Sequence, residues 1–263
     1  MKNFLVIGNP IEHSLSPKLH NHWIKSNNID AIYNKKKLDI SELENLLKEV
    51  KKKKINGINV TVPFKNSIIP FLDKLSNEAE KTQSVNTIFL KGETIIGHNT
   101  DIEGFEMAIK DINYDVGGKK VLLLGAGGVA PSIIVALINM QAQKILISNR
   151  TPSKAENLKK TFGEVEIVEW GTIPDFDMII NATTLGLKVN DNINLDFSKI
   201  GSDKFFYDVI YNPSETNFLK SAKKIGNKTE NGKKMFVYQA QASFKIWNNI
   251  EPKIDKEVME ILN

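Results

Sequence analysis

Residues 121–131, VLLLGAGGVAP, carry the strongest architectural signal in this sequence. The four apolar residues at 121–124 have the length and composition of a buried parallel strand. A glycine-rich turn follows at once, and an apolar run to about Met140 predicts a helix. N–H groups at the start of a helix lack intrahelical partners, and the helix dipole adds partial positive charge there. The stretch therefore predicts a strand, a tight turn and a helix N-terminus that binds an anion.

The glycine turn alone is a weak signal, because Ala130 replaces its third glycine and an ordinary tight turn has a similar composition. Glycine is needed where a pyrophosphate approaches the backbone, since a side chain would keep it away. The next apolar run, 144–148, predicts a second parallel strand, which ends in residues 149–151 (Asn-Arg-Thr) with Lys154 beyond. An acidic residue there would bond the ribose of NAD, whereas Arg150 and Lys154 attract a 2′-phosphate. This half is therefore predicted to bind NADP(H) in preference to NAD(H).

The composition is ordinary for a globular protein, with 41% hydrophobic and 25% charged residues among 263. There is no cysteine, which excludes disulfides, thiolate metal sites and a cysteine nucleophile. The sequence has no run of about eighteen apolar residues, and the apolar run near residue 5 is too short for a signal peptide. We therefore expect a cytoplasmic protein that does not associate with membranes.

Two lysine clusters, 35–37 and 51–54, are candidate nucleic-acid contacts in a chain of net charge +4. A helical explanation suits the second cluster better. Ser41 and Glu44 form a capping box for a helix over 41–52, and cations are favourable at the end of such a helix. No aromatic residues alternate with the lysines for base stacking, so no nucleic acid is expected. The four histidines lack metal-ligand spacing, and no metal is expected either.

The N-terminal half alternates predicted strands and helices, which is typical of an α/β unit. One helix opens at Ser16, the expected N-cap, with Pro17 as its first residue. The third strand runs towards Lys65, and catalytic groups in open α/β sheets lie just past the carboxyl ends of strands. Asp101 opens the helix after a predicted hairpin. Both residues also have plain explanations, as a solvated lysine and a helix cap. The predicted strands are 3–8, 31–38, 57–62, 85–90 and 94–98.

A linker at 113–119 is predicted to mark the boundary between the two halves. In the second half we expect a helix from Pro152 and strands near 176–180 and 204–210. The C-terminal part, 233–262, is predicted to be helical. The residues spaced for its buried face are Met235, Tyr238, Ala242 and Ile246, with Gln239 close to that face.

Nine strings of this sequence resemble, in the same order, the shikimate dehydrogenase family. They extend from residue 6 to about residue 247, and nine strings in register are highly specific where any single one is not. The strings are VIGNPIEHSLSP, NVTVPFK, SVNT, GHNTD, LLGAGGVA, SNRT, NATTLG, YDVIYNP and MFVYQAQASFKIW.

The resemblance implies an α/β protein of two domains. An N-terminal substrate domain would comprise residues 1–101 and 236–263, so that the C-terminal helices pack back on it, and a Rossmann-type NADP-binding domain would comprise 102–235. Family members reduce 3-dehydroshikimate to shikimate with NADPH, on the route to chorismate and the aromatic amino acids. By resemblance, Lys65 and Asp101 would form the catalytic acid–base pair. The implied substrate-binding residues are Ser14, Ser16, Asn59, Thr61, Asn86, Tyr211 and Gln239.

The resemblance also places NADP(H) along the second half, with pyrophosphate on the glycine turn and the 2′-phosphate on residues 149–154. The implied cofactor-binding residues are Gly125, Gly127, Gly128, Val129, Asn149, Arg150, Thr151, Lys154, Thr183, Gly232 and Met235. Ser84 and Gln241 stand where the family usually has alanine. Lys154 stands where arginine is common, and lysine cannot make a bidentate phosphate contact.

Three alternatives stay open. A quinate/shikimate dehydrogenase of the same superfamily accepts quinate and often NAD, which the Arg150 motif argues against. A folate-type methylene dehydrogenase of similar plan would not need the serine pair or the NVTVPFK string. A catalytically inactive NADP-binding regulator is expected to have lost Lys65 or Asp101, and both are present. The only partners expected are the small-molecule substrate and, if the protein is a homodimer instead of a monomer, a second copy.

Overall fold

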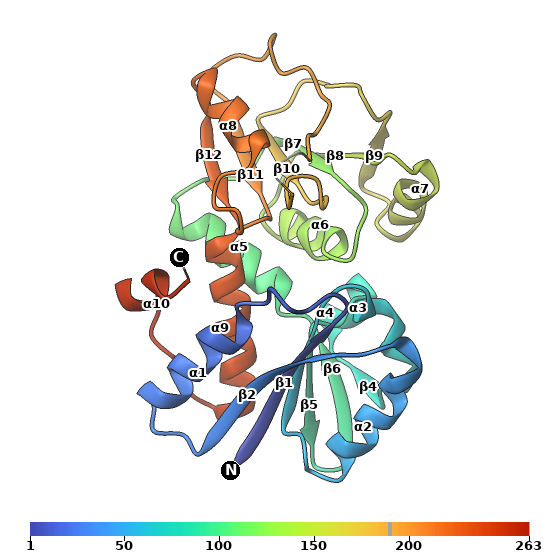
Figure 1. Ribbon diagram of the computed structural model, residues 1–263. Helices are drawn as coiled ribbons and strands as arrows, with labels where there is room; N and C mark the ends of the chain where they lie inside the picture. The colour runs from blue at the N-terminus through green and yellow to red at the C-terminus, as the bar shows by residue number, and fades with distance from the viewer. Residues whose placement is uncertain (189–190, 263) are drawn as a thin grey trace. The chain divides into compact units, whose positions relative to one another are not determined.

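A computed structural model describes residues 1–188 and 191–262, and the chain divides into two compact units (Figure 1). Unit 1 consists of Met1–Gly104 and Val237–Asn263, and unit 2 of Phe105–Phe236. The first division falls inside helix α5 (Asp101–Asp111) and the second inside helix α9 (Lys233–Asn248). The prediction of a boundary linker at 113–119 is wrong, because these residues lie within unit 2, after α5 has carried the chain into it.

Unit 1 is built on one mixed sheet of six strands in the order β2-β1-β3-β5-β6-β4. Strands β1, β2 and β3 are parallel, whereas β5 runs antiparallel to both β3 and β6. The predicted hairpin is present, and Gly92 in its turn has a φ of 64°, which glycine adopts at little cost. The strands are β1 (Lys2–Gly8), β2 (Ala31–Lys37), β3 (Gly57–Val60), β4 (Lys74–Leu75), β5 (Thr87–Lys91) and β6 (Thr94–His98).

Helices cover both faces of this sheet (Figure 1). Successive strand residues point to opposite faces, so Leu5 and Ile7 join the apolar cluster under α2 while Phe4 stacks on Trp247 of α9. The helices of the unit are α1 (Ser16–Ser26), α2 (Leu43–Lys51), α3 (Phe64–Ser67), α4 (Asn77–Thr82), α9 and α10 (Lys256–Glu260), with short 3-10 turns at Ile40–Glu42 and Ile69–Phe71.

Two predicted helix starts are wrong in detail. The capping box joins Asp39 and Glu42, one turn before α2, and the Glu42 carboxylate accepts from the N–H of Asp39 at 2.8 Å. Glu44 pairs instead with Lys48 on the surface of α2. Ser16 is already the first residue of α1, so the N-cap position belongs to Leu15, which provides no side-chain cap.

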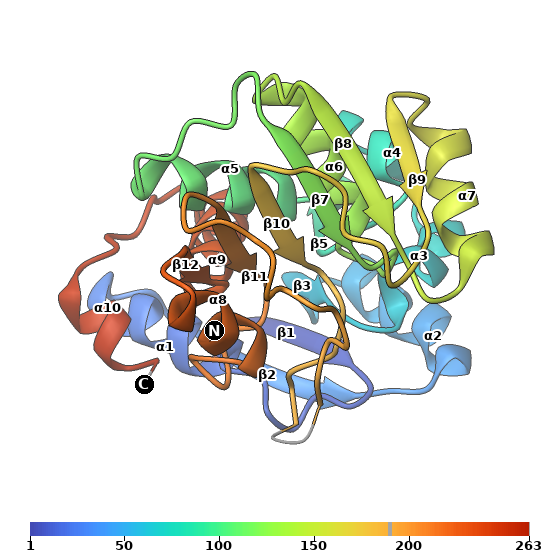
Figure 2. The same ribbon diagram turned by 90° about the horizontal axis from the view of Figure 1, so that it is seen from above.

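Unit 2 is a fully parallel sheet of six strands in the order β12-β11-β10-β7-β8-β9 (Figure 2). Numbered from β7, this is the 3-2-1-4-5-6 order of the dinucleotide-binding fold, and the order reverses between β7 and β10. The strands are β7 (Lys120–Leu124), β8 (Lys144–Ser148), β9 (Val165–Val168), β10 (Met178–Asn181), β11 (Phe205–Asp208) and β12 (Lys228–Asn231), with helices α6 (Ala130–Asn139), α7 (Pro152–Thr161) and α8 (Asn217–Lys224).

The C-terminal segment is only partly as predicted. It forms α9 and α10, but residues 249–255 between them are not helical. Met235 and Ala242 of the predicted buried face are buried, whereas Tyr238 and Ile246 are only half-buried, because the face is centred on Val237, Ala240 and Phe244. Within the described part of the chain, no helix is long and apolar enough to cross a membrane.

Candidate active site and cofactor site

Lys65 and Asp101, which the sequence places 36 residues apart, form an ion pair in unit 1. Lys65 lies on α3, immediately past the carboxyl end of β3, and Asp101 is the first residue of α5, which follows β6. The Nζ of Lys65 is 2.5 Å from Oδ2 of Asp101, and the two side chains are 11% and 8% exposed. A cation and a carboxylate are thus held together where solvent reaches them only in part.

The carboxylate of Asp101 is available for this pair because another residue caps the helix. Oδ1 of Asn99 accepts from the N–H of Asp101 at 3.0 Å and from that of Ile102 at 3.3 Å. The remaining carboxylate oxygen of Asp101, Oδ1, accepts from Nδ2 of Asn86 at 2.8 Å. The plain interpretation of Asp101 as the N-cap is therefore wrong.

A network of buried polar side chains lies behind the pair. Asn86 also accepts from the N–H of Thr100 at 2.8 Å and from the hydroxyl of Thr87 at 3.0 Å. Asn59 donates to Ser243 of α9 at 3.0 Å and accepts from the hydroxyl of Tyr33 at 2.6 Å. Asn59 is 6% exposed, so its amide is committed to protein partners.

Most members of this network could not be predicted from the sequence. Thr87, Thr100, Ser243 and Tyr33 are buried, and a buried polar residue carries a signal only when the partner that faces it is known. The sequence offers one clue for two of them, since Thr87 is adjacent to Asn86 and Thr100 is adjacent to Asp101.

Four other predicted substrate residues also lie in unit 1. Ser14 precedes α1, and its Oγ accepts from the N–H of Ser16 at 3.3 Å. Ser16 is buried, and Thr61 is half-buried just past β3. Gln239 of α9 accepts from Nδ2 of Asn86 at 3.4 Å, which brings it to the same polar network.

Tyr211 belongs to unit 2, where it follows β11. Its ring stacks on Phe236 with centroids 4.5 Å apart, and burial raises the pKa of its hydroxyl to about 12. A tyrosine in this state is a neutral hydrogen-bond donor and acceptor at physiological pH.

The glycine turn of unit 2 closely follows its predicted form. Gly125 has a φ of 103°, and a Cβ there would lie 3.0 Å from the backbone of Ala182 at the end of β10. Asn149, past β8, accepts from the N–H of Ala126 at 3.0 Å and so ties the turn to the next loop. Val129 precedes α6 and supplies no side-chain cap, and the N–H groups at such a helix start can bind an anion.

The predicted 2′-phosphate residues lie in the loop after β8 and, for Lys154, in the first turn of α7. Arg150, Thr151 and Lys154 are all exposed. Across residues 1–188 and 191–262, neither cation has an ion pair, so both charges are available to a ligand. Arg150 is also the only arginine of the chain.

Three further predicted cofactor-binding residues are spread over unit 2. Thr183 follows β10, and its hydroxyl donates to Asn181 at 2.7 Å. Gly232 lies against β11, since a Cβ there would be only 2.1 Å from the carbonyl oxygen of Val209. Met235 is buried in the first turn of α9.

A buried carboxyl at the end of β11 had no counterpart in the predictions. Asp208 accepts from Thr216 at 2.6 Å and from Asn181 at 3.0 Å, with no cation among these partners. Burial raises the pKa of Asp208 to about 6. This group fixes the loop after β11, from which Tyr211 comes.

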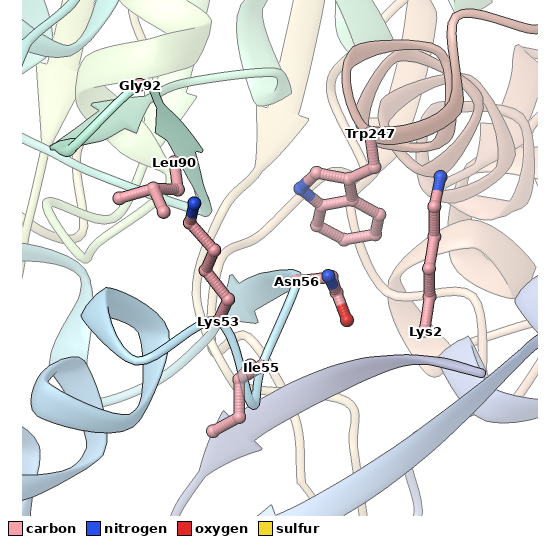
Figure 3. Close-up of a pocket in the computed structure, with 7 residues that line it drawn as sticks. All are labelled: Lys2, Lys53, Ile55, Asn56, Leu90, Gly92 and Trp247. Atoms are coloured by element: carbon pink, nitrogen blue, oxygen red, sulfur yellow. The ribbon is translucent and has the colours of Figure 1, made fainter.

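A pocket of unit 1 lies elsewhere, at the amino ends of β1 and β3 (Figure 3). Its volume is about 280 Å³, and the close-up shows Trp247 at its wall with Lys2 and Lys53 beside it. None of the predicted site residues lines it. Within the described ranges, no three histidine, aspartate or glutamate side chains gather as metal ligands would.

Comparisons with known proteins cover the whole chain. Residues 6–88 match the family model of the shikimate dehydrogenase substrate binding domain, and 106–202 match that of shikimate / quinate 5-dehydrogenase. The shikimate dehydrogenase (NADP(+)) of Pelagibacter ubique is 60% identical over 262 residues, which are 100% of this chain and 99% of that relative.

Solved structures agree in fold. Shikimate 5-dehydrogenase from Thermus thermophilus in complex with NADP(H) and shikimate is 31% identical, with a TM-score of 0.90 over 99% of this chain and 97% of its own. Shikimate 5-dehydrogenase from Listeria monocytogenes in complex with shikimate and NAD is 28% identical, with a TM-score of 0.91 over 100% and 96%.

Proposed function

The chain belongs to the shikimate dehydrogenase family, and we propose that it catalyses the reversible NADP(H)-dependent reduction of 3-dehydroshikimate to shikimate. The observation that carries the proposal is the ion pair of Lys65 and Asp101, held at 2.5 Å in a half-enclosed position past the end of β3. The product would enter the synthesis of chorismate and the aromatic amino acids.

The pair suits the chemistry of ketone reduction. NADPH, when bound, supplies the hydride that reaches the ketone carbon. Negative charge then develops on the ketone oxygen, so that a positioned cation and proton donor lowers the barrier. The ammonium of Lys65 provides both, and the carboxylate of Asp101 accepts a hydrogen bond from its Nζ and holds it in place. In the reverse direction Lys65 takes the proton back.

The polar residues around the pair suit a ring that carries several hydroxyls. Ser14 and Ser16 would bind the substrate carboxylate, with Gln239 nearby, and Thr61 and Asn86 would bind hydroxyls. Tyr211 of unit 2 would be a further substrate-binding residue. Asn59 would sit beside them, since its amide already serves Tyr33 and Ser243. A site with buried hydrogen-bonding groups strongly rejects analogues that lack the matching hydroxyl.

Unit 2 suits NADP(H) better than NAD(H). The backbone of the turn at Gly127, Gly128 and Val129 would hold the pyrophosphate at the start of α6. Arg150 would hold the 2′-phosphate, assisted by Asn149, Thr151 and Lys154. Its guanidinium is the only one in the chain and, among residues 1–188 and 191–262, has no competing carboxylate partner, which supports this assignment.

The test is a nicotinamide-absorbance assay of the purified protein with shikimate or quinate, each offered with NADP or NAD. We expect turnover of shikimate with NADP, and little or none with the other three combinations. Efficient turnover of quinate or use of NAD would place the chain in the quinate/shikimate branch. Intact NADP binding without turnover in any combination would favour the regulator.

Three further points belong to the proposal. We expect the enzyme to act in the cytoplasm, on small molecules alone. Its oligomeric state, monomer or homodimer, stays a prediction to be measured by sedimentation. The domains proposed from the sequence, 1–101 with 236–263 for substrate and 102–235 for NADP(H), correspond to units whose own divisions fall at 104/105 and 236/237.

A further inference from the structure

One loop of unit 1, residues 82–85, is connected to both members of the catalytic pair. It contacts the backbone of Lys65 directly and reaches Asp101 through Asn99. The N–H of Val85 donates to the carbonyl oxygen of Lys65 at 2.8 Å, which fixes the backbone of α3 to this loop. On the other side, Nδ2 of Asn99 donates to the carbonyl oxygen of Ser84 at 2.8 Å and to the hydroxyl of Thr82 at 3.2 Å. The loop therefore joins the element that carries Lys65 to Asn99, which caps the start of α5.

Asn99 uses both ends of its amide to make this connection. Its oxygen accepts from the N–H groups of Asp101 and Ile102, at 3.0 and 3.3 Å, while its nitrogen reaches the loop. The side chain is 1% exposed, so water cannot replace these contacts. Asparagine is suited to the position because it offers an acceptor and two donors without bringing a charge near the ion pair.

The alternative cap is Asp101 itself, whose residue type is strongly favoured at helix starts. A carboxylate that bound the first amides of α5 would have one fewer oxygen for Lys65 and Asn86. Asn99 caps the start of α5 in its place, through the N–H groups of Asp101 and Ile102. Both carboxylate oxygens of Asp101 are then used by Lys65 and Asn86. The geometry of the ion pair thus depends on a residue outside the pair.

We propose that Asn99 is a positioning residue, which holds the carboxylate of Asp101 on the ammonium of Lys65 by joining the start of α5 to the loop at 82–85. The inference rests on the proposed function, because it assigns a role within the same catalytic pair. It adds a residue to that mechanism which acts only through Asp101.

The test measures kcat, both KM values and the thermal midpoint for three single variants. Asn99→Ala removes both halves of the connection, and we expect kcat to fall about 10- to 100-fold, as small misplacements of catalytic groups do. The KM for NADP should stay unchanged. In Asn99→Ser the hydroxyl can accept from the N–H two residues ahead. Asn99→Ser thus keeps the cap without the donor to the loop, so we expect a kcat between those of wild type and Asn99→Ala. If Asn99→Ala does not fold, a wild-type kcat in a folded Asn99→Ser overturns the positioning role.

The matched control is Asp255→Ala, which removes the side-chain cap of α10 in the same unit. It should lower the thermal midpoint and leave kcat unchanged. The double variant Asn99→Ala/Asp101→Asn should be no slower than Asp101→Asn alone, because residues that act as one unit are not additive.

The outcomes separate the two proposals. A wild-type protein that does not turn over shikimate with NADP overturns the proposed function, and the positioning role with it. An active wild type together with a folded Asn99→Ala variant of normal kcat overturns the positioning role alone. The positioning role is also overturned if the losses of kcat in Asn99→Ala and Asp101→Asn multiply in the double variant. It is overturned too if Asp255→Ala loses as much kcat as Asn99→Ala.

Discussion

Lys65 and Arg150 carry the two decisive positive charges of the proposed reaction, and their surroundings are opposite. Lys65 is 11% exposed, and its carboxylate partner is itself held by Asn86. Arg150 is exposed, and in the described ranges of the chain its guanidinium has no partner. The group that performs chemistry is oriented before substrate arrives, whereas the group that recognises a cofactor keeps its charge free for the ligand. Substitutions should therefore affect rate at one position and affinity at the other.

The largest effect is expected for Lys65→Ala. Loss of one donor to a developing oxyanion typically lowers the rate about 100- to 1000-fold, or roughly 3–4 kcal/mol of barrier. We expect at least that loss in kcat for shikimate oxidation, with a much smaller change in substrate KM. Steady-state kinetics with saturating NADP measure it.

The matched control for Lys65→Ala is Lys53→Ala, which removes an exposed lysine of the same unit. It should leave kcat within about twofold, since exposed charges far from a site contribute little. Near-normal turnover of Lys65→Ala would remove this residue from the mechanism.

The second effect in size concerns Arg150→Ala. Hydrogen bonds to charged groups contribute about 1.5–3 kcal/mol, so NADP binding should weaken roughly 10- to 100-fold. NAD lacks the 2′-phosphate, and its binding should hardly change. The dissociation constants of both cofactors are measured by adding each one to the protein and following the quenching of tryptophan fluorescence.

The single arginine offers an independent check of this assignment. Phenylglyoxal, which reacts with guanidinium groups, has one target in the chain. Modification should reproduce the Arg150→Ala phenotype, and NADP should protect against it better than NAD. Equal weakening of the two cofactors would contradict a 2′-phosphate contact.

A third prediction concerns a buried group without partners. His20 is 1% exposed and stacks on Tyr33, with ring centroids 4.2 Å apart, and neither of its ring nitrogens has a hydrogen-bond partner in the part of the chain described. Burial lowers the pKa of His20 to about 3, from an ordinary value of 6.5. The unfolded chain therefore binds the proton more tightly, and stability is lost as pH falls from 6.5 towards 3.

His20→Phe should abolish this dependence and keep the ring stack. At pH 5 the difference amounts to about 2 kcal/mol in favour of the variant. Thermal midpoints of wild type and variant between pH 7 and pH 4.5 measure it, and His13→Gln, at an exposed histidine, should behave as wild type. Parallel curves for wild type and His20→Phe would show that His20 accepts a proton in the folded state.

Asp208 provides the opposite sign in unit 2. Its folded pKa of about 6 lies above the ordinary 3.8, so its contribution to stability is complete below 3.8 and is lost as pH rises through 6. A buried group in each unit thus responds to the same pH range in contrary directions.

The smallest effect is expected for Lys154. Exposed ion pairs contribute up to about 1 kcal/mol, so Lys154→Ala should weaken NADP binding only a few-fold. Lys154→Arg should tighten it, because a guanidinium can contact a phosphate through two nitrogens. The same fluorescence titration, repeated at high salt, separates this screened contact from that of Arg150. Tightening of NAD as well would mean that the arginine does not contact the 2′-phosphate.

Much of the fold was predictable from the sequence because buried parallel strands are apolar runs. Strands β7 and β8 are buried over four of their five residues and were found at once. Strand β12, Lys228–Asn231, lies at a sheet edge and contains no apolar residue, so no pattern marked it. The capping box failed for another reason: Asp39 with Glu42 fits the same spacing as Ser41 with Glu44.

For the candidate site, the charged members were predictable and their supports were not. Lys65 and Arg150 follow strands that could be recognised, so their positions past the sheet edges were expected. The roles of Asn99 and Ser243 depend on which amide or hydroxyl faces them across sequence separations of tens of residues. Periodicity and spacing carry no such information, because the sequence around a buried asparagine is the same in kind whether its side chain caps a helix or binds a ligand.

The insertion of unit 2 into unit 1 has a consequence for synthesis on the ribosome. Trp247 packs on Gly57, where a Cβ would lie 2.4 Å from its indole, and Ser243 completes the hydrogen bonds of Asn59. The first hundred residues therefore leave the ribosome without the helix that fills one face of their sheet. Residues 105–236 form one uninterrupted stretch and can mature while translation continues. In this enzyme the half that emerges first is the half that is finished last.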